Sequence, residues 1–127
     1  ARRRLGPLGQ NVRWMTGDIR TVDLPEQTYD IWHDRAVFHF LTDPGDRVAY
    51  VRQVVKSVKP GGHVIVATFA PDGPEQCSGL PVVRYDPNQL HDEFGPAFEL
   101  LEHTSEAHKT PWGSVQHFIY CHCRAPY

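Results

Sequence analysis

The stretch that decides the fold is residues 47–69, RVAYVRQVVKSVKPGGHVIVATF. Its valines recur every three or four residues between 48 and 58, which predicts an amphipathic helix lying on a sheet. The remaining positions, expected to face solvent, are Arg47, Arg52, Gln53, Lys56 and Lys59. Pro60 ends the helix, and Gly61 and Gly62 allow a tight reversal. The run 63–69 is apolar and β-branched, as in a strand covered on both faces, so the whole stretch is half of a βαβ unit.

The rest of the chain extends this pattern in both directions. Alternating residues 11–15 and 28–33 predict two earlier strands, separated from the helix by a short helical or irregular segment over 36–41. A Pro/Gly-rich loop covers 70–79, and 86–95 carries an acid, a proline and a terminal glycine in the order typical of a short helix. Residues 98–103 and 115–124 predict two closing strands. We therefore expect an α/β fold: a mostly parallel sheet with helices on both faces and an antiparallel hairpin at one edge.

Composition excludes several classes of protein. The 127 residues suffice for one domain, and the net charge of −2 gives no general attraction to nucleic acid. No apolar run approaches the roughly 20 residues that span a bilayer, and no signal peptide is visible, so we expect no membrane partner. Three cysteines without a disulfide spacing indicate reduced thiols. The prediction is a cytoplasmic protein.

Three segments together resemble a known family. They are Gly17-Asp18-Ile19, residues 29–41 (YDIWHDRAVFHFL) and residues 58–66 (VKPGGHVIV). Their order and spacing are similar to the C-terminal two-thirds of a class I S-adenosylmethionine-dependent methyltransferase, which has a Rossmann-like fold. The resemblance implies that residues 1–127 hold strands 3 to 7 of that domain, with residues 70–85 as the substrate-cover loop. The family's first two strands and its glycine-rich cofactor loop have no counterpart here, so we expect an N-terminally truncated domain.

The resemblance implies S-adenosylmethionine as cofactor and assigns residues to it. Asp18 would accept a hydrogen bond from the adenine amino group, beside the amide of Ile19. His33, Asp34 and Arg35 would contact the cofactor where strand 4 of the family ends. On local grounds alone, Asp18 is equally a strand-ending cap, and Asp34 with Arg35 a surface ion pair.

The resemblance also implies methyl transfer to a small-molecule acceptor. Transfer is an in-line displacement that needs a base only when the nucleophile carries a proton, and His33, Asp34 and His39 are the candidates. Packing in the core is the alternative role for His39. Arg84 and Tyr85 are candidates for holding an anionic or aromatic acceptor, unless their loop is only a tolerated surface insertion.

Other chemistries are less well supported by the sequence. Cys121, His122 and Cys123 cannot share one metal ion on a strand, because His122 points away from the two thiols. Cys77 has no identifiable base that would make it a nucleophile. The serious alternative function is a non-catalytic, truncated domain that acts as a self-associating interaction module. Strand edges left exposed by the missing strands would then form a homodimer.

Overall fold

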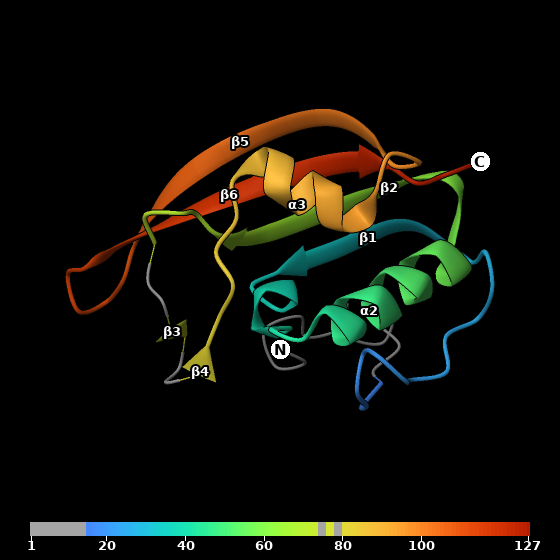
Figure 1. Ribbon diagram of the computed structural model, residues 1–127, viewed down its shortest axis with the longest axis horizontal. Helices are drawn as coiled ribbons and strands as arrows, with labels where there is room; N and C mark the ends of the chain where they lie inside the picture. The colour runs from blue at the N-terminus through green and yellow to red at the C-terminus, as the bar shows by residue number, and fades with distance from the viewer. Residues whose placement is uncertain (1–14, 74–75, 78–79) are drawn as a thin grey trace, which may run out of the picture.

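A computed structural model describes residues 15–73, 76–77 and 80–127 (Figure 1). The strands are β1 (Tyr29–Arg35), β2 (Val58–Phe69), β3 (Gln76–Cys77), β4 (Leu80–Pro81), β5 (Glu99–Lys109) and β6 (Val115–Arg124). The helices are the 3-10 turn η2 (Phe38–Phe40), α2 (Pro44–Ser57) and α3 (Pro87–Phe94). Residues 11–14 of the predicted first strand lie outside the described residues.

The main sheet has the strand order β1-β2-β6-β5. β1 and β2 are parallel, with Trp32 opposite Val64, whereas β6 runs antiparallel to both of its neighbours, β2 and β5. The α/β fold and its antiparallel edge hairpin are thus confirmed, and the described sheet is mixed, with one parallel pair. The short strands β3 and β4 pair only with each other, within the predicted 70–85 loop.

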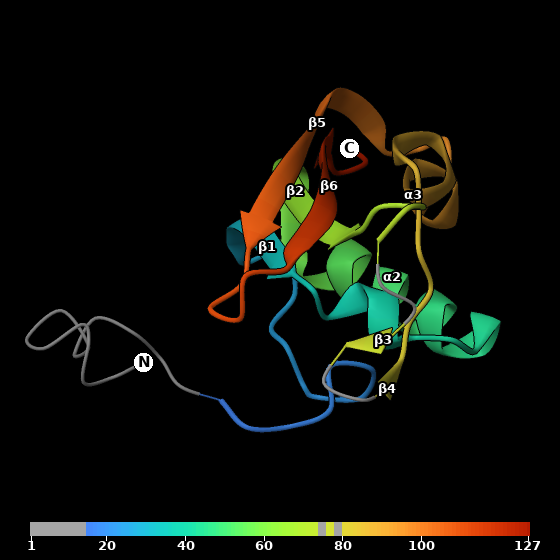
Figure 2. The same cartoon turned by 90° about the vertical axis from the view of Figure 1, so that its left-hand side faces the viewer.

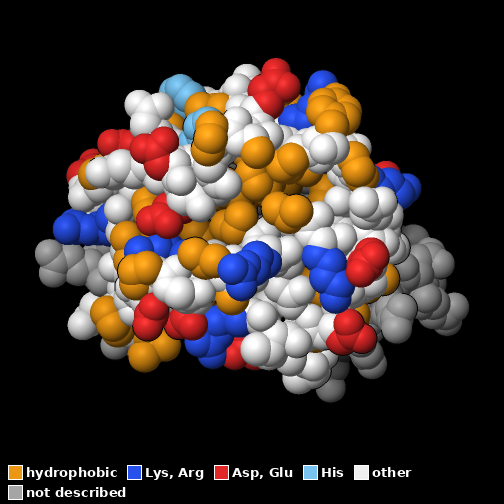
Figure 3. Space-filling model, turned by 45° about the vertical axis from the view of Figure 1, so that its right-hand side comes forward, with side chains coloured by type: hydrophobic (Ala, Val, Ile, Leu, Met, Phe, Trp, Pro, Cys, Tyr) orange, Lys and Arg blue, Asp and Glu red, His pale blue; other side chains and the backbone are white. Residues whose placement is uncertain are grey.

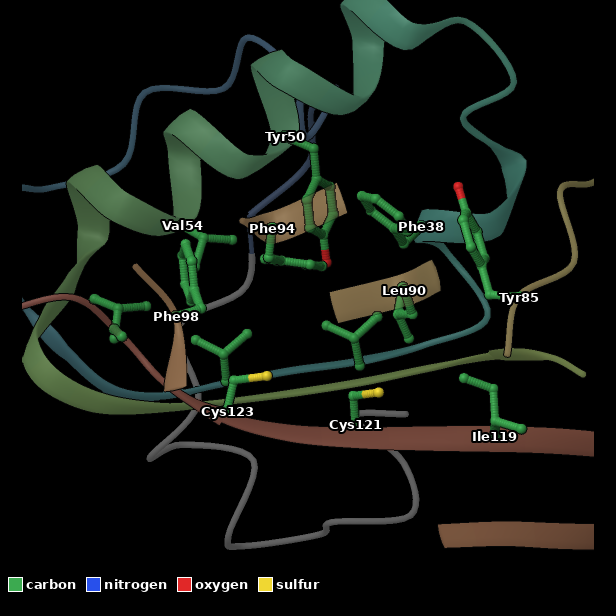
Figure 4. Packing of buried hydrophobic residues seen from close by; sticks show 14 of the residues in the cluster. Phe38, Tyr50, Val54, Tyr85, Leu90, Phe94, Phe98, Ile119, Cys121 and Cys123 are labelled. Atoms are coloured by element: carbon green, nitrogen blue, oxygen red, sulfur yellow. The ribbon is translucent and has the colours of Figure 1, made fainter. Parts of the chain in front are cut away.

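Both α-helices lie on the same face of the sheet, as Figure 2 shows. Tyr50 and Val54 from α2 and Leu90 and Phe94 from α3 share one core with alternate residues of the strands. The rings of Phe38, Tyr50 and Phe94 converge in its centre (Figure 4). Neither described α-helix covers the opposite face, where a smaller cluster forms around Phe69 and Phe118.

Helix α2 begins at Pro44, and its buried side chains differ from the predicted valine stripe. Asp43 caps it by accepting from the amide of Gly45 at 2.8 Å. The buried side chains are Tyr50, Gln53, Val54 and Ser57, whereas Val48 and Val55 are half exposed. Gln53 was expected to face solvent, and this was wrong. Its amide Nε2 donates to the carbonyls of Ile19 and Val22 at 3.1 and 2.6 Å, so α2 is fastened to the segment before β1.

Strand β2 starts immediately at the end of α2, earlier than predicted. The register against β1 moves from Tyr29 opposite Val58 to Ile31 opposite His63, and residues 59–62 form the irregularity between these pairs. Gly61 has a φ of +75° there. A Cβ added to Gly62 would lie 2.6 Å from the Cγ1 of Val58 and 2.9 Å from the carbonyl of Lys59, so only glycine fits.

Helix α3 is bounded by the residues that the sequence indicated. Asp86 and Gln89 form a reciprocal capping box, and Gly95 ends the helix with a φ of +98°. On the face shown in Figure 3, Lys and Arg side chains are interspersed with Asp and Glu. Among the described residues, no helix is long and apolar enough to cross a membrane.

Candidate functional site

A cavity of about 300 Å³ opens where β1 ends. Ile19, His33, Asp34 and Arg35, four of the residues predicted to contact a cofactor, are among those that line it. The other lining residues are Trp32, Val37 and Tyr50. A crevice at the carboxyl end of a parallel strand is where ligands bind in open α/β sheets, so the cavity is the candidate site.

Asp34 is the buried polar centre of this cavity. Its carboxylate accepts hydrogen bonds from the amides of Val37 and Phe38, at 2.9 and 3.0 Å, and from the hydroxyl of Tyr50 at 2.5 Å. Burial raises the pKa of Asp34 even though these three donors oppose the shift. With its oxygens occupied, Asp34 shapes the turn into η2.

The turn after β1 has an unusual backbone. Ala36 has a φ of +65°, a conformation that L-residues other than glycine seldom adopt. Its amide donates to the carbonyl of Ala67 at 2.9 Å, which ties the turn to β2. This conformation turns the chain so that the next two amides reach the carboxylate of Asp34.

Trp32 and Tyr50 are cavity residues that sequence reasoning missed. The indole Nε1 of Trp32 donates to the hydroxyl oxygen of Tyr50 at 2.8 Å, and that hydroxyl in turn donates to Asp34. Burial and the neighbouring Asp34 carboxylate raise the pKa of Tyr50 well above its usual value. The sequence signal for Tyr50 was its place within the valine-rich helix. A tyrosine buried there needs a hydrogen-bond partner for its hydroxyl, but the sequence does not say which residue that partner is.

Asp18 lies beside the cavity and outside its lining. Arg20 grips its carboxylate, with Nε 2.9 and 3.1 Å from the two oxygens, and also pairs with Asp46 at 3.0 Å. The side-chain hydrogen bond from Arg20 lowers the pKa of Asp18 to about 2. Asp18 is therefore an ionised acceptor next to Ile19, already in contact with a cation.

His33 and Arg35 point to the face of the sheet that the α-helices leave uncovered. Both are exposed. The guanidinium of Arg35 lies 5.0 Å from the ring centroid of Phe118 and 3.8 Å from the carboxylate of Glu106 on β5. The predicted Asp34–Arg35 surface ion pair is wrong, because Asp34 is turned into the core and Arg35 pairs with Glu106.

His39 is fully buried and does not line the cavity. Its Nδ1 accepts from the amide of Phe69 at 3.2 Å, and within the described residues its Nε2 has no hydrogen-bond partner. Burial lowers the pKa of His39 to about 4, so the imidazole is neutral at pH 7 with its proton on Nε2.

Arg84 and Tyr85 lie away from the cavity. Arg84 donates to the carbonyl of Gly73 at 3.1 Å. The ring of Tyr85 packs in the core next to Phe38, with centroids 5.8 Å apart (Figure 4). Burial raises the pKa of Tyr85 to about 12.

The cysteine and histidine pattern of β6 follows strand geometry. Cys121 and Cys123 point into the core, where burial raises the pKa of their thiols to about 12 and 11. His122 lies on the other face, with Nε2 2.8 Å from Nδ1 of His63. In the part of the chain that the structure describes, no group of three metal-ligating side chains comes together.

Comparison with known proteins found similar sequences and similar folds. Residues 1–62 match the family described as a methyltransferase domain. A 1,6-didemethyltoxoflavin-N1-methyltransferase from Burkholderia thailandensis, solved with S-adenosylhomocysteine, superposes with a TM-score of 0.73 at 16% identity, over 98% of this chain and 56% of that one. The chain therefore has the fold of this methyltransferase.

Two further methyltransferases show the same fold. The N-methyltransferase NodS from Bradyrhizobium japonicum gives a TM-score of 0.69 at 17% identity, over 98% of this chain and 69% of that one. An S-adenosylmethionine-dependent methyltransferase from Methanosarcina mazei gives 0.69 at 11% identity, over 87% and 65%. The chain spans roughly half to two-thirds of the length of the structures that it matches. Comparison with curated proteins gave no match.

The cavity residues are chemically suited to S-adenosylmethionine, the cofactor that the resemblance implies. Ile19 and Val37 offer apolar contact to a flat base, and the indole of Trp32 offers a π surface to a cationic centre. Asp18 and Asp34 are acidic groups beside and within the cavity, whereas Arg35 is the single Lys or Arg among its described lining residues. S-adenosylmethionine would supply an electrophilic methyl group, and these residues would hold and align the reacting partners.

Proposed function

We propose that this domain serves in methyl transfer from S-adenosylmethionine to a small-molecule acceptor, with the cofactor held in the cavity at the end of β1. The observation that carries the proposal is the meeting of Ile19, His33, Asp34 and Arg35 around one cavity. The family resemblance independently assigns these four residues to the cofactor, and they come from two separate segments of the chain.

The individual roles follow from their surroundings. Asp18, ionised and exposed beside Ile19, serves as acceptor for the adenine amino group, with Arg20 as a second ligand of the same carboxylate. His33, exposed on the cavity wall, contacts the cofactor and is open to solvent. Asp34 and His39 act as positioning residues, because their polar atoms are engaged or enclosed.

The acceptor side is proposed to lie under residues 70–85, beyond the end of β2. Arg84 contributes there by holding the carbonyl of Gly73, and Tyr85 by packing the far end of the loop into the core. The buried, unreactive thiols Cys121 and Cys123 are compatible with a reducing, cytoplasmic location.

Calorimetric titration of the 127-residue chain with S-adenosylhomocysteine tests the proposal. We expect saturable binding, accompanied by a change in Trp32 fluorescence. Asp18→Asn should weaken the affinity by about tenfold, the effect of losing one charge-assisted hydrogen bond. Asp23→Asn is the matched control, because Asp23 is an exposed acid on the same segment whose one ion pair among the described residues is with Lys56. A chain that is folded by circular dichroism and shows no binding would refute the proposal.

A second function, a self-associating interaction module, has one observation in its favour. Within the described residues β1 is hydrogen bonded to β2 on one side only, and Ile31 on this edge strand is 59% exposed. Sedimentation equilibrium distinguishes the two: a dimer that Ile31→Lys converts to monomer, without binding of S-adenosylhomocysteine, supports the module.

A further inference from the structure

A second cavity, of about 290 Å³, lies at the same end of the sheet. It is bounded by the turn that follows β2 and by the β5-β6 hairpin. Its lining residues are Ala70, Asp72, Ser105, Glu106, Ala107 and His117. It contains an imidazole and two carboxylates, and none of the described lining residues is a lysine or an arginine.

Asp72 orients the imidazole of His117. The Nδ1 atom of His117 lies 2.9 Å from Oδ2 of Asp72, and this hydrogen bond lowers the pKa of Asp72. A carboxylate accepts only, so it selects the tautomer with the proton on Nδ1 and leaves the lone pair on Nε2. Among the described residues, Nε2 of His117 has no hydrogen-bond partner. An imidazole held in this way can accept a proton at Nε2 while the carboxylate stabilises the resulting charge.

Both groups of this pair are carried on anchored backbone. His117 is on β6, and its carbonyl accepts from the amide of Ala70 at 2.9 Å. The turn that bears Asp72 closes through the amide of Gly73, which donates to Ala70 at 2.8 Å. Arg84 holds the same turn from the other side through the carbonyl of Gly73, at 3.1 Å. A Cβ on Gly73 would lie 3.0 Å from the Ala70 carbonyl oxygen, so the turn is close-packed.

The two cavities are neighbours. Arg35 lines the first cavity, Glu106 lines the second, and their side chains form an ion pair at 3.8 Å. Only the ion pair between Arg35 and Glu106 would therefore stand between a ligand in the second cavity and a ligand in the first. Glu106 and Asp72 also make the second cavity acidic, which disfavours carboxylates and phosphates and favours a cation.

We propose that the second cavity binds the methyl acceptor, that the acceptor is a small amine, and that His117 is its proton acceptor. This inference rests on the proposed function. The protonated amine transfers one N–H proton to Nε2 of His117, and the freed nitrogen lone pair attacks the methyl carbon of the sulfonium cofactor. The carbon–sulfur bond breaks with its electron pair going to sulfur, so the products are the methylated ammonium, the neutral thioether and imidazolium.

Two probes that differ in charge test the site by heteronuclear NMR on the full chain. Phenethylamine and hydrocinnamate have the same ring and similar length, but one ends in an ammonium and the other in a carboxylate. We expect phenethylamine to shift the amide signals of Asp72, Ser105 and His117, and hydrocinnamate at the same concentration to leave them unchanged. Asp72→Asn and His117→Gln should each weaken amine binding at least fivefold. His103→Gln, an exposed histidine on β5 outside this cavity, should have no effect.

The tautomer of His117 is read independently from long-range imidazole nitrogen spectra. We expect Nδ1–H in the neutral ring of the wild type and a reversion toward Nε2–H in Asp72→Asn. A wild-type ring protonated on Nε2, equal binding of both probes, or shifts confined to other surfaces would overturn the inference.

Titration with S-adenosylhomocysteine on the same samples separates the two proposals. If S-adenosylhomocysteine binds and the amine does not, the proposed acceptor site is overturned and the proposed cofactor site in the first cavity stands. If the amine binds at His117 and S-adenosylhomocysteine does not bind, the proposed methyl transfer is overturned and the second cavity is an amine-binding site of another function.

Discussion

The hydroxyl of Tyr50 donates a 2.5 Å hydrogen bond to the buried carboxylate of Asp34. The two residues are 16 positions apart, one on α2 and the other at the end of β1, so this bond joins the helix to the rim of the first cavity. Trp32 donates to the same hydroxyl, so Trp32, Tyr50 and Asp34 form a chain of hydrogen bonds. The cavity wall and the helix therefore share one hydrogen-bond network.

Tyr50→Phe should destabilise the fold by about 1 to 3 kcal/mol, because it removes a donor from a buried carboxylate and an acceptor from a buried indole. Urea unfolding measures the loss. Tyr29→Phe is the matched control, since no hydrogen bond of the Tyr29 hydroxyl occurs among the described residues, and it should change stability by less than about 0.5 kcal/mol. Equal stabilities of the two variants would mean that the Tyr50–Asp34 bond makes no net contribution.

Because Ala36 has a left-handed backbone conformation, we expect glycine at this position to stabilise the fold, the opposite of its usual effect. Ala36→Gly should keep or raise the stability, by up to about 1 kcal/mol, because the strain of a Cβ at positive φ is removed. Ala36→Val should lower it by more than about 1 kcal/mol. Ala49→Gly in the middle of α2 is the control and should cost about 1 kcal/mol. Thermal unfolding of the three variants checks the signs, and a destabilised Ala36→Gly would contradict the strain.

Gly62 should tolerate no side chain. In Gly62→Ala the new methyl would overlap Val58 and the carbonyl of Lys59, so β2 must shift against β1 at a cost of about 2 to 3 kcal/mol or more. Gly113→Ala is the comparison, because Gly113 has open space around its Cα and pays only for its positive φ of +86°, which Gly62 lacks. It should cost only about 1 kcal/mol. Denaturant unfolding of the two variants measures these losses of stability. Equal losses would contradict the argument from close packing at Gly62.

His39 predicts a fall in stability on mild acidification. Its pKa is about 4 in the folded chain and near 6.5 when unfolded, so the unfolded state binds the extra proton between these values. The stability that the neutral imidazole provides is fully present above pH 6.5 and is lost as pH falls toward 4, a change of about 3 kcal/mol. In His39→Asn, whose amide oxygen replaces the Nδ1 acceptor, this part of the slope should vanish. Parallel slopes for wild type and variant in urea unfolding from about pH 7 to about pH 4 would show that His39 is protonated without penalty.

Features set by local hydrogen bonding were predictable from the sequence. Asp86 caps its helix as expected, because a side chain that bonds an amide three residues away needs no tertiary partner. The grouping of Ile19 with His33 was also foreseen, because a family resemblance carries tertiary information that periodicity lacks.

Features set by tertiary contact were missed. Gln53 was placed in solvent because the period of the valines, taken alone, does not reveal which stripe the sheet covers. The burial of Tyr85 was not predicted, because it depends on the contact of this ring with Phe38 of η2. The pairing of Asp72 with His117 joins residues 45 positions apart and left no trace in either local segment.

The side-chain amide of Gln53 links α2 to the segment that supplies Ile19 to the first cavity. The carbonyls that it holds, those of Ile19 and Val22, flank the backbone of the segment that presents Asp18. Fraying of one turn of α2 would release that segment, and the first cavity would lose a wall while the sheet stayed folded. A compound that displaces the Gln53 side chain from these two carbonyls would therefore alter the first cavity without entering it.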